Sequence, residues 1–185
     1  MTTTIAVKLN NKIVFASDSA VSNYGRIWMM KEGKFHKTND GIVIGNAGSM
    51  REKQVVEFGL TMPTLQHAET ADHYMYRVAN AIKEAFLERK TNKDDENCNG
   101  SMILSYQGKL YYFGSDFQIT EFSGYFEAVG SGQYYAIGAM SVMIENGETD
   151  PLKVATKAVE TAIKYDPWTV GPVHTLEIEC PVESE

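Results

Sequence analysis

The first residues of the chain alternate between apolar and polar side chains with the period of a half-buried strand. Residues 5–9 are apolar at every second position, and a second apolar run covers residues 13–16. Successive side chains of a strand point to opposite faces, so this alternation predicts a strand with one face in a core. Asn10 and Asn11 separate the two runs, and asparagine tolerates the positive φ of a tight turn. We therefore predict a β-hairpin at the start of the chain.

Later segments repeat the strand pattern. Turn residues at 39–41 and 107–108 each separate two short apolar runs, which is typical of hairpins. The first of these hairpins is predicted to end at residues 45–49. The strands predicted from these runs and from one near the end of the chain cover residues 34–37, 42–44, 102–104, 110–113 and 173–178, and a further strand is predicted to begin at Phe126, before a glycine turn. A charged surface loop is predicted over residues 91–100.

Four stretches predict amphipathic helices. The first begins near Met50, and the third follows a glycine-rich turn near residue 131. The fourth has Asp150 as its N-cap and a proline at its first position, and Pro167 predicts its end near Asp166. The second covers residues 71–90, with a predicted apolar stripe of Tyr76, Val78, Ala79, Ile82, Ala85 and Phe86.

The order of these elements predicts the fold class. Two hairpins precede two helices, several strands follow, and two helices and one strand complete the chain. Because strands and helices come in blocks, we expect an α+β fold with mostly antiparallel sheets and helices layered outside them. Two such sheets between two helix layers would form a four-layer αββα sandwich. We expect one domain over residues 1–185, since this length suits a single core.

Composition and charge exclude several classes of function. The net charge is −7, which disfavours nucleic acid as the main partner because phosphate binding needs a basic face. No apolar run approaches the ~20 residues of a membrane span, and no signal-peptide pattern precedes the first strand. Cys98 and Cys180 form no metal-ligand spacing. We expect a cytoplasmic protein that uses neither a metal nor a cofactor.

The N-terminus contains a candidate catalytic residue. Aminopeptidases remove an initiator methionine that precedes a small residue, and removal of Met1 would leave Thr2 with a free α-amine beside its hydroxyl. A threonine hydroxyl is a weak nucleophile that needs a base to accept its proton. An α-amine has a reference pKa of about 7.7–8.0, and a nearby ammonium group would lower that pKa. One residue could therefore supply both the nucleophile and the base.

Asp18 is the second candidate. It follows the return strand of the first hairpin, whose two outer ends meet, so its carboxylate is expected within reach of the N-terminus. A strand that begins at the nucleophile would also hold the reacting atoms in place. The same residues fit a second interpretation, in which the threonines are an ordinary polar terminus and Asp18 caps a turn.

Four segments that follow one another along the chain carry a family resemblance. They are TTTIAVKL with KIVFASDS, KFHKTNDGIVIGNAGS, VGSGQYYAIGAM and DPWTVGP. Together they resemble the proteasome-type β subunits of the N-terminal-nucleophile hydrolases, especially the bacterial HslV-type and Anbu-type members. FASDS and TVGP are more Anbu-like, whereas HTLEI is more HslV-like.

The resemblance implies the αββα fold of the N-terminal-nucleophile hydrolases and a threonine peptidase. Thr2 would be the nucleophile and its amine the general base, and the count back from Asp18 favours it over the two threonines that follow. Asp18 would hold Lys34, whose charge would lower the pKa of the amine. Lys31 and Lys37 lie three residues to either side, and the family register favours Lys34.

Four further residues would complete the site by the same resemblance. Gly48 would donate its backbone N–H to the oxyanion, although by itself it fits an ordinary turn glycine equally well. Ser131 would hydrogen-bond the Thr2 amine, and Asp166 and Thr169 would brace Ser131 and the terminus. The family more often has serine at the position of Thr169, and threonine keeps the hydroxyl.

The resemblance also implies partners. A peptide or unfolded protein would be the substrate, and a homo-oligomeric ring or helical assembly would enclose the site. The HslV-type members imply an ATPase unfoldase as a further partner, whereas the Anbu-type members do not. We expect neither nucleic acid nor membrane as a partner. Two alternatives stay open: a non-catalytic proteasome-like structural or interaction subunit, and an amide hydrolase of the same superfamily that acts on small molecules.

Overall fold

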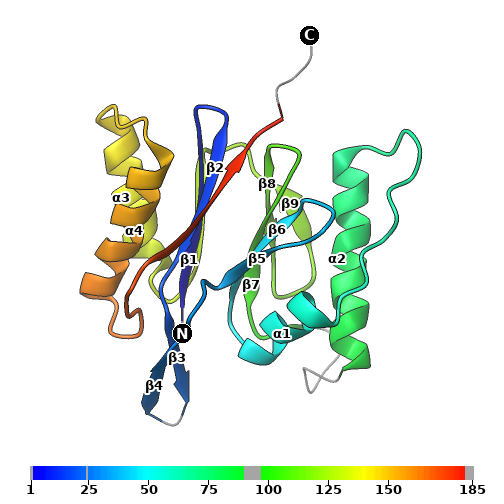
Figure 1. Ribbon diagram of the computed structural model, residues 1–185, viewed down its shortest axis with the longest axis horizontal. Coiled ribbons are helices and arrows are strands. Elements are labelled where there is room, and N and C mark those ends of the chain that lie inside the picture. Colours follow the sequence, from blue (N-terminus) through cyan, green and yellow to red (C-terminus); the bar gives the residue numbers. More distant parts are fainter. Residues whose placement is uncertain (1, 24, 90–96, 182–185) are drawn as a thin grey trace.

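Within residues 2–23, 25–89 and 97–181, which the computed structural model describes, two antiparallel sheets face each other (Figure 1). The N-terminal sheet has the strand order β10-β1-β2-β11 and comprises β1 (Thr3–Leu9), β2 (Lys12–Ser17), β10 (Phe126–Gly130) and β11 (His174–Glu179). The second sheet has the order β5-β6-β7-β8-β9 and comprises β5 (Phe35–Lys37), β6 (Val43–Ala47), β7 (Ser101–Tyr106), β8 (Lys109–Phe113) and β9 (Ile119–Glu121). The hairpin of β3 (Ala20–Asn23) and β4 (Arg26–Met29) projects from the body near the N-terminus.

Helices cover the outer faces of both sheets (Figure 1). α1 (Met50–Phe58) and α2 (Ala71–Glu88) lie outside the second sheet, and α3 (Gln133–Glu145) and α4 (Pro151–Tyr165) lie outside the N-terminal sheet. The layers therefore run α, β, β, α, which confirms the predicted sandwich. In the part of the chain that the structure describes, every helix is too short or too polar to cross a lipid bilayer.

The central strands are buried on both faces because a layer packs on each side of them. In β1, Ile5 and Val7 pack against α3 and α4, whereas Ala6 packs between the two sheets. In β6, Ile44 belongs to the core under α2, and Val43 belongs to the core between the sheets. The protein thus has three apolar cores, one under each helix layer and one between the sheets. Each sheet contributes side chains to two of them.

Local sequence accounts for the first turn and for the limits of α4. Asn10 and Asn11 have φ values of 49° and 59° in the turn between β1 and β2, as predicted. The Asp150 carboxylate accepts the Leu152 N–H at 3.0 Å and therefore caps α4. The helix ends immediately before Asp166, also as predicted.

The structure corrects the predicted stripe of α2. The periodicity places Tyr76 in that stripe, but Tyr76 is 58% exposed and Tyr74 and Met75 are buried instead. At about 100° per residue, Tyr76 points far from the face that contains Met75, Val78 and Ile82. An aromatic residue near a buried stripe is therefore not necessarily part of it.

Other differences concern the strands. Residues 45–47, predicted as the end of a hairpin, continue β6. The hairpin β3–β4 and strand β9 were not predicted, because each is only three or four residues long and shows little alternation. Most of the charged loop predicted over residues 91–100 lies outside the described residues.

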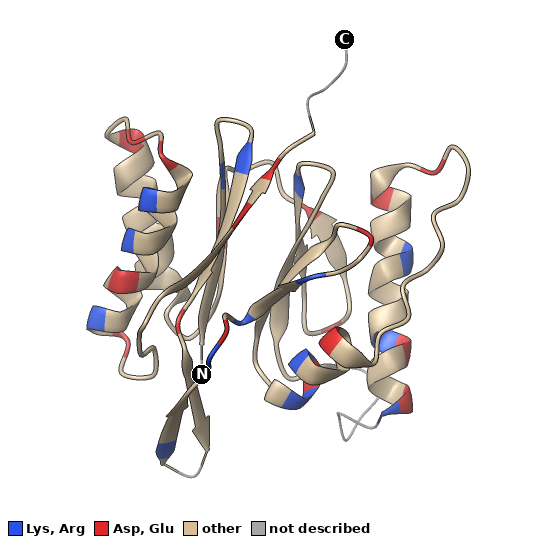
Figure 2. Ribbon diagram, in the orientation of Figure 1, with Lys and Arg blue, Asp and Glu red and all other residues tan. Residues whose placement is uncertain are grey.

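Several strand ends meet at one edge of the sandwich. Thr3 pairs with Gly130 across β1 and β10, and Thr4 pairs with Ser17 across β1 and β2. Figure 2 shows that charged residues concentrate on the helices, the loops and the strand ends, whereas the middle of each sheet is largely uncharged. Polar and charged side chains can therefore cluster at this edge without disrupting the apolar cores.

We expect Gly130→Ala to destabilise the protein, because Gly130 has a φ of 103° and a Cβ there would lie 2.0 Å from the Thr2 carbonyl oxygen. The backbone conformation alone costs a non-glycine residue about 1–3 kcal/mol. The matched control is Gly138→Ala, in α3, where a Cβ would meet none of the described atoms within 4 Å. This control should raise the free energy of unfolding by about 0.5–1 kcal/mol. Denaturant unfolding measures both variants, and similar effects would contradict the expectation.

Candidate active site

Thr2, the first of the three threonines that follow Met1, borders a cavity. It is 5% exposed and lines a cavity of about 380 Å³. Thr3 and Thr4 are fully buried in β1, and the Thr4 hydroxyl donates to the backbone oxygen of Asn46 at 2.9 Å. A substrate in the cavity could therefore reach Thr2 but neither of its neighbours.

Lys34 lies between Thr2 and Asp18. Its ammonium nitrogen is 3.0 Å from Thr2 Oγ1 and 2.7 Å from Asp18 Oδ1. The side chains of Lys34 and Asp18 are 2% and 0% exposed, so this ion pair is shielded from water. Lys31 and Lys37, the alternatives to Lys34, are exposed. The structure thus brings Thr2, Asp18 and Lys34 together.

Backbone donors from separate segments hold the Asp18 carboxylate. Oδ1 accepts the Thr3 N–H at 2.8 Å, and Oδ2 accepts the N–H groups of Ala20 at 3.0 Å and Val170 at 3.4 Å. A buried carboxylate is stable only when such partners replace its lost hydration. Asp18 is therefore fixed relative to β1, to the start of β3 and to the segment after α4.

The environment of Lys34 alters its acid–base properties. Burial lowers the pKa of the Lys34 ammonium below its ordinary value, and the Asp18 carboxylate partly offsets that effect. In a site of low dielectric constant, the charge of Lys34 acts strongly on its neighbours. Such a charge would lower the pKa of an α-amine on Thr2, because two nearby cations disfavour each other.

A second set of hydrogen bonds reaches the backbone of Thr2. The Thr2 nitrogen donates to Ser131 Oγ at 3.4 Å. Ser131 in turn donates to Asp166 Oδ2 at 2.7 Å, and Thr169 Oγ1 donates to the same oxygen at 2.6 Å. The hydroxyls of Thr3 and Thr169 lie 2.7 Å apart, which connects this set back to β1. The structure thus places Ser131, Asp166 and Thr169 together at the start of the chain.

The carboxyl group of Asp166 accepts several hydrogen bonds within this set. Burial would raise the pKa of its carboxyl group, but hydrogen bonds from Ser131, Thr169 and the Trp168 N–H outweigh burial and hold the pKa below its ordinary value. The Trp168 N–H lies 3.2 Å from Asp166 Oδ1. Because the Ser131 hydroxyl donates its hydrogen bond to Asp166, the oxygen lone pairs of Ser131 are free to accept a hydrogen bond from the Thr2 nitrogen.

Gly48 lines the same cavity as Thr2, immediately after β6. Its φ is 128°, a conformation that favours glycine. A Cβ at this position would also lie 2.6 Å from the backbone oxygen of Asn99 and the Cα of Gly100. Turn geometry and close packing therefore both require a glycine here, and its N–H stays the predicted oxyanion donor.

Some contacts of the site were not predicted from the sequence. The Lys34 N–H donates to Ser17 Oγ at 2.9 Å, so the lysine is held at its backbone as well as at its ammonium group. Residues 20–23 and 49–51 form walls of the cavity beside Thr2. A role for Ser17 could have been predicted from the three polar residues at 17–19, which directly follow an apolar strand. The segments that form the cavity walls are short, and their sequences show no pattern from which a cavity could be predicted.

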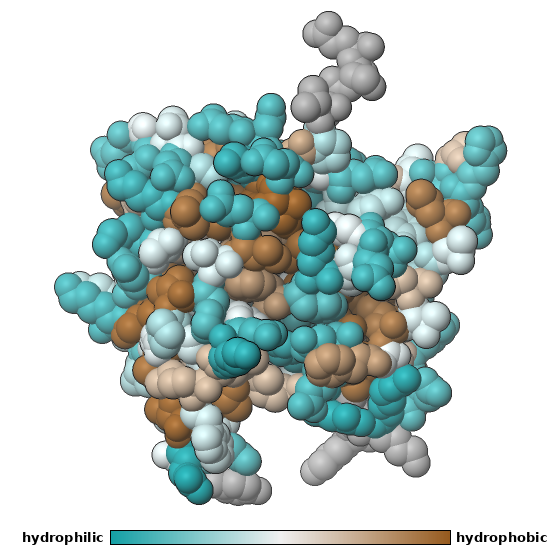
Figure 3. All heavy atoms as spheres, viewed as in Figure 1, coloured by the Kyte–Doolittle hydropathy of each residue, from teal (hydrophilic) through white to brown (hydrophobic). Residues whose placement is uncertain are grey.

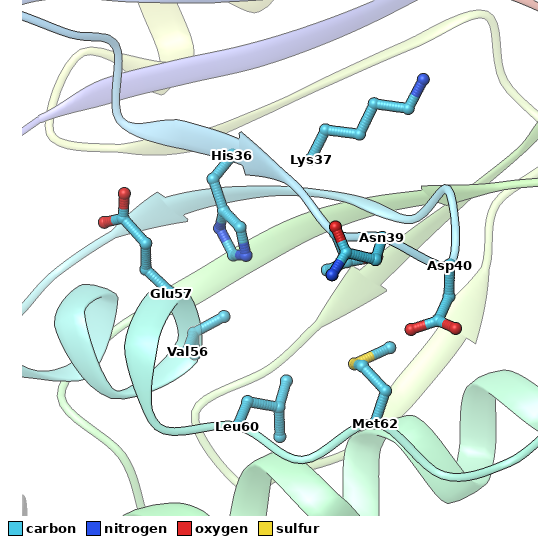
Figure 4. A pocket seen from close by; sticks show the side chains of 9 residues that line it. His36, Lys37, Asn39, Asp40, Val56, Glu57, Leu60 and Met62 are labelled. Atoms are coloured by element: carbon cyan, nitrogen blue, oxygen red, sulfur yellow. The ribbon is translucent and has the colours of Figure 1, made fainter.

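A second cavity of about 330 Å³ lies between the turn after β5 and the end of α1 (Figure 4). His36 points into it beside Glu57, and Leu60 and Met62 line its apolar side. Burial lowers the pKa of His36 below its ordinary value, an effect that Glu57 opposes. This cavity shares no lining residue with the cavity beside Thr2 and contains none of the predicted site residues.

Comparisons with known proteins agree with this geometry. A sequence model of the proteasome subunit family matches residues 1–178. The chain belongs to this family. A curated relative, the ATP-dependent protease subunit HslV of Caldicellulosiruptor saccharolyticus, is 24% identical over 180 residues, which cover 96% of this chain and 98% of that one. The match therefore extends over nearly the full length of both chains, which confirms the HslV-like resemblance.

Solved structures support the family fold. Thiobacillus denitrificans BPH in complex with epoxomicin has a TM-score of 0.82 at 21% identity, over 97% of this chain and 100% of that one. Anbu (ancestral beta-subunit) from Yersinia bercovieri has a TM-score of 0.69 at 14% identity, over 96% of this chain and 82% of that one. At these identities the likeness establishes a shared fold, and it confirms the αββα sandwich of a proteasome-type subunit.

The ion pair predicts non-additive effects of mutation. Lys34→Met leaves the Asp18 carboxylate buried without its cation, a loss that typically costs about 3–5 kcal/mol. Asp18→Asn in the same chain removes that unpaired charge, so the double variant should lose less stability than the sum of the single variants. We expect a coupling energy of about 1–3 kcal/mol. Denaturant unfolding of the four proteins completes the cycle, and additive losses would show that the two charges do not interact.

The second set of hydrogen bonds predicts a measurable change in acidity. Thr169→Val should raise the pKa of Asp166, because it removes a hydroxyl that stabilises the carboxylate. Thr169→Ser is the control and should leave the pKa close to that of the parent protein, since it keeps the donor. Carbon-13 NMR titration of the carboxyl group measures both values. A pKa that is the same in all three proteins would refute the proposed bond.

Proposed function

We propose that this protein is a threonine-type peptidase, a proteasome-like subunit in which removal of Met1 exposes Thr2 as an N-terminal nucleophile. One observation carries the proposal: Thr2 Oγ1 borders a cavity and lies 3.0 Å from the ammonium group of Lys34, which is itself paired with buried Asp18. The name of the curated relative, a subunit of an ATP-dependent protease, supports the same activity. The structural neighbour in complex with epoxomicin supports a ligand site in this fold.

The first chemical step forms an ester between substrate and enzyme. The α-amine of Thr2 accepts the proton of its own hydroxyl, and Oγ1 attacks the carbonyl carbon of a peptide bond. The negative charge on the carbonyl oxygen is stabilised by the Gly48 N–H. The carbon–nitrogen bond then breaks, and the leaving amine takes the proton from the Thr2 ammonium group. Lys34 favours the neutral amine at the start of this step by lowering its pKa.

The second step releases the acyl group. A water molecule gives a proton to the same amine and attacks the ester carbon, after which the carbon–oxygen bond to Thr2 breaks and Oγ1 regains the proton. The amine must stay in one position throughout both steps. Ser131 supports this requirement, because its hydroxyl accepts from the Thr2 nitrogen and is itself held by Asp166.

We further propose peptide or unfolded protein substrates, an assembly with other copies of the chain, and an ATPase partner. The name of the curated relative supports the last two points. Exposed apolar side chains also favour an assembly: α3 exposes Tyr134 and Val142, and β4 exposes Ile27 and Met29. Figure 3 shows apolar atoms over the β3–β4 hairpin on this face of the molecule.

The proposal predicts a specific covalent product. A peptide epoxyketone closes a ring only with a hydroxyl and a free α-amine on the same residue. Intact mass before incubation should show the loss of Met1, and intact mass afterwards should show one adduct that maps to Thr2. Thr2→Ala should lose the adduct and lower kcat/KM for peptide cleavage by about 10³-fold or more. Thr2→Ser is the matched control, because it keeps both reacting groups and should still form the adduct.

Other outcomes would favour the alternatives. A retained Met1, or a free Thr2 that stays unlabelled in the assembled protein, would indicate a non-catalytic subunit. A labelled Thr2 that cleaves small amides but no peptide would indicate a small-molecule amide hydrolase. Peptide cleavage that persists in pure Thr2→Ala protein would place the nucleophile elsewhere.

A further inference from the structure

The direction of the Gly48 N–H depends on the peptide group that Gly48 shares with Ala47. In a trans peptide the C=O and N–H bonds point to opposite sides, and the cis peptide bond within the described residues lies elsewhere, at 171–172. A Cβ on Gly100 would overlap the Ala47 carbonyl oxygen, whereas the carbonyl carbon would be 2.9 Å away. The oxygen therefore faces Gly100, and the Gly48 N–H points away from Gly100.

Residues 99 and 100 pack against this peptide group with backbone atoms. Ala47 pairs with Ser101 across β6 and β7, so the residues just before Ser101 lie beside Gly48. A Cβ on Gly100 would also lie 2.9 Å from the Cα of Gly48. Backbone atoms in such close contact have no side-chain rotamer through which to relax. A shift of residues 99–100 would therefore turn the peptide group and redirect the Gly48 N–H.

Glu52 holds Asn99 in place. It lies in the first turn of α1 and is 2% exposed. Its Oε1 accepts the backbone N–H of Asn99 at 2.8 Å and the side-chain Nδ2 of Asn99 at 3.0 Å, which fixes both the position and the orientation of Asn99. The preceding residue, Cys98, donates its N–H to the Ser115 oxygen at 2.7 Å. Residues 98–100 are thus connected to α1 and to the segment after β8.

Stabilisation of the helix terminus does not account for the contacts of Glu52. An acid in the first turn favours a helix because it lies near free N–H groups, and an exposed acid can do this equally well. The N-terminus of α1 is already capped by Ser49, whose hydroxyl accepts the Arg51 N–H at 3.2 Å. Glu52 is instead buried, where a carboxylate needs donors that replace its lost hydration. Asn99 supplies these donors, so the carboxylate and residues 98–100 hold each other.

We propose that Glu52 is a positioning residue for the oxyanion: through residues 99–100 it fixes the direction in which the Gly48 N–H donates. This inference rests on the proposed peptidase function of Thr2. Glu52 is not among the described residues that line the cavity beside Thr2, so it acts on the reaction through its neighbours. The oxyanion forms only after Thr2 has attacked, and the position of its donor therefore affects kcat more than KM.

Two substitutions of Glu52 test this role with the fluorogenic peptide amide that the parent protein cleaves fastest. Glu52→Leu keeps a similar volume but removes the acceptor, and it should lower kcat by about 10²-fold while KM stays close to the parent value. Glu52→Gln keeps an oxygen with two lone pairs, which can accept both Asn99 donors. Its kcat should stay within about fivefold of the parent value, because only the charge assistance of these bonds is lost.

A peptide boronate reports on the oxyanion position directly. Its boron forms a tetrahedral adduct with a hydroxyl nucleophile, and a hydroxyl group on the boron then occupies the position of the oxyanion. Glu52→Leu should weaken boronate binding by the same factor as it lowers kcat. Its affinity for a carboxamide of the same peptide should equal that of the parent protein, because this ligand forms no tetrahedral centre. A general loss of structure would weaken the binding of both ligands.

Glu69→Leu is the matched control. The Glu69 side chain is also 2% exposed, and its Oε2 accepts the backbone N–H of Gln66 at 3.0 Å, ahead of α2. The variant therefore removes the same charge and a comparable backbone contact at equal burial. Neither Glu69 nor Gln66 is among the described residues that line the cavity beside Thr2. The kcat and the boronate affinity of this control should match those of the parent protein.

Asn99→Ala tests the same contact from the other side and replaces Glu52→Leu if that variant does not fold. It removes the Nδ2 donor and keeps the backbone N–H, so one of the two hydrogen bonds to Glu52 remains. We expect kcat to fall by about fivefold, the size of one typical hydrogen bond, with KM unchanged.

Epoxyketone labelling of Thr2 separates this inference from the proposed function. If Thr2 of the parent protein is not labelled and no peptide is cleaved, the proposed function fails and the inference fails with it. If Thr2 is labelled but the folded Glu52→Leu or Asn99→Ala variant keeps the parent kcat, the inference alone is refuted. An equal loss of kcat in Glu69→Leu, or a lower kcat without weaker boronate binding, would also refute it.

Discussion

The ion pair between Lys34 and Asp18 is the interaction on which the rest of the site depends. A lysine can be buried beside Thr2 only if a fixed carboxylate offsets its loss of hydration. That carboxylate is fixed in turn by backbone N–H groups of Thr3, Ala20 and Val170, which belong to segments far apart in the sequence. The position of one ammonium group therefore requires β1, the start of β3 and the segment after α4 to be in place.

The same arrangement divides the tasks around Thr2. Lys34 and Asp18 set the charge near its hydroxyl, whereas Ser131 and Asp166 hold its backbone nitrogen. The two sets are linked through Thr3, whose N–H contacts Asp18 and whose hydroxyl contacts Thr169. Thr2, which directly precedes β1, is thus held at both its side chain and its backbone nitrogen. A reaction that depends on fixed geometry requires such positioning.

Much of the fold follows from local patterns. The Asn10–Asn11 turn fixes the register of β1 and β2, and this register alone brings residues 17–18 to the start of β1. The cap at Asp150 and the proline after Asp166 likewise set the limits of α4 before any tertiary contact is considered. Local patterns failed at Tyr76, which lies next to a buried stripe without belonging to it, and at the short hairpin β3–β4, whose strands show no clear period.

The sequence by itself determined the hairpin, its register and the approach of Asp18 to the start of β1, because these depend on turn residues and on alternation within twenty residues. Lys34, Gly48, Ser131, Asp166 and Thr169 could be assigned only by resemblance to the proteasome-type family, since no local rule links residues so distant along the chain. Only the tertiary structure decided which groups contact Thr2, that the Ser17 hydroxyl accepts the Lys34 N–H, and that Arg51 borders the cavity. The physical reason is that these contacts form between layers, where side-chain packing and burial, rather than the period of any one segment, set the distances.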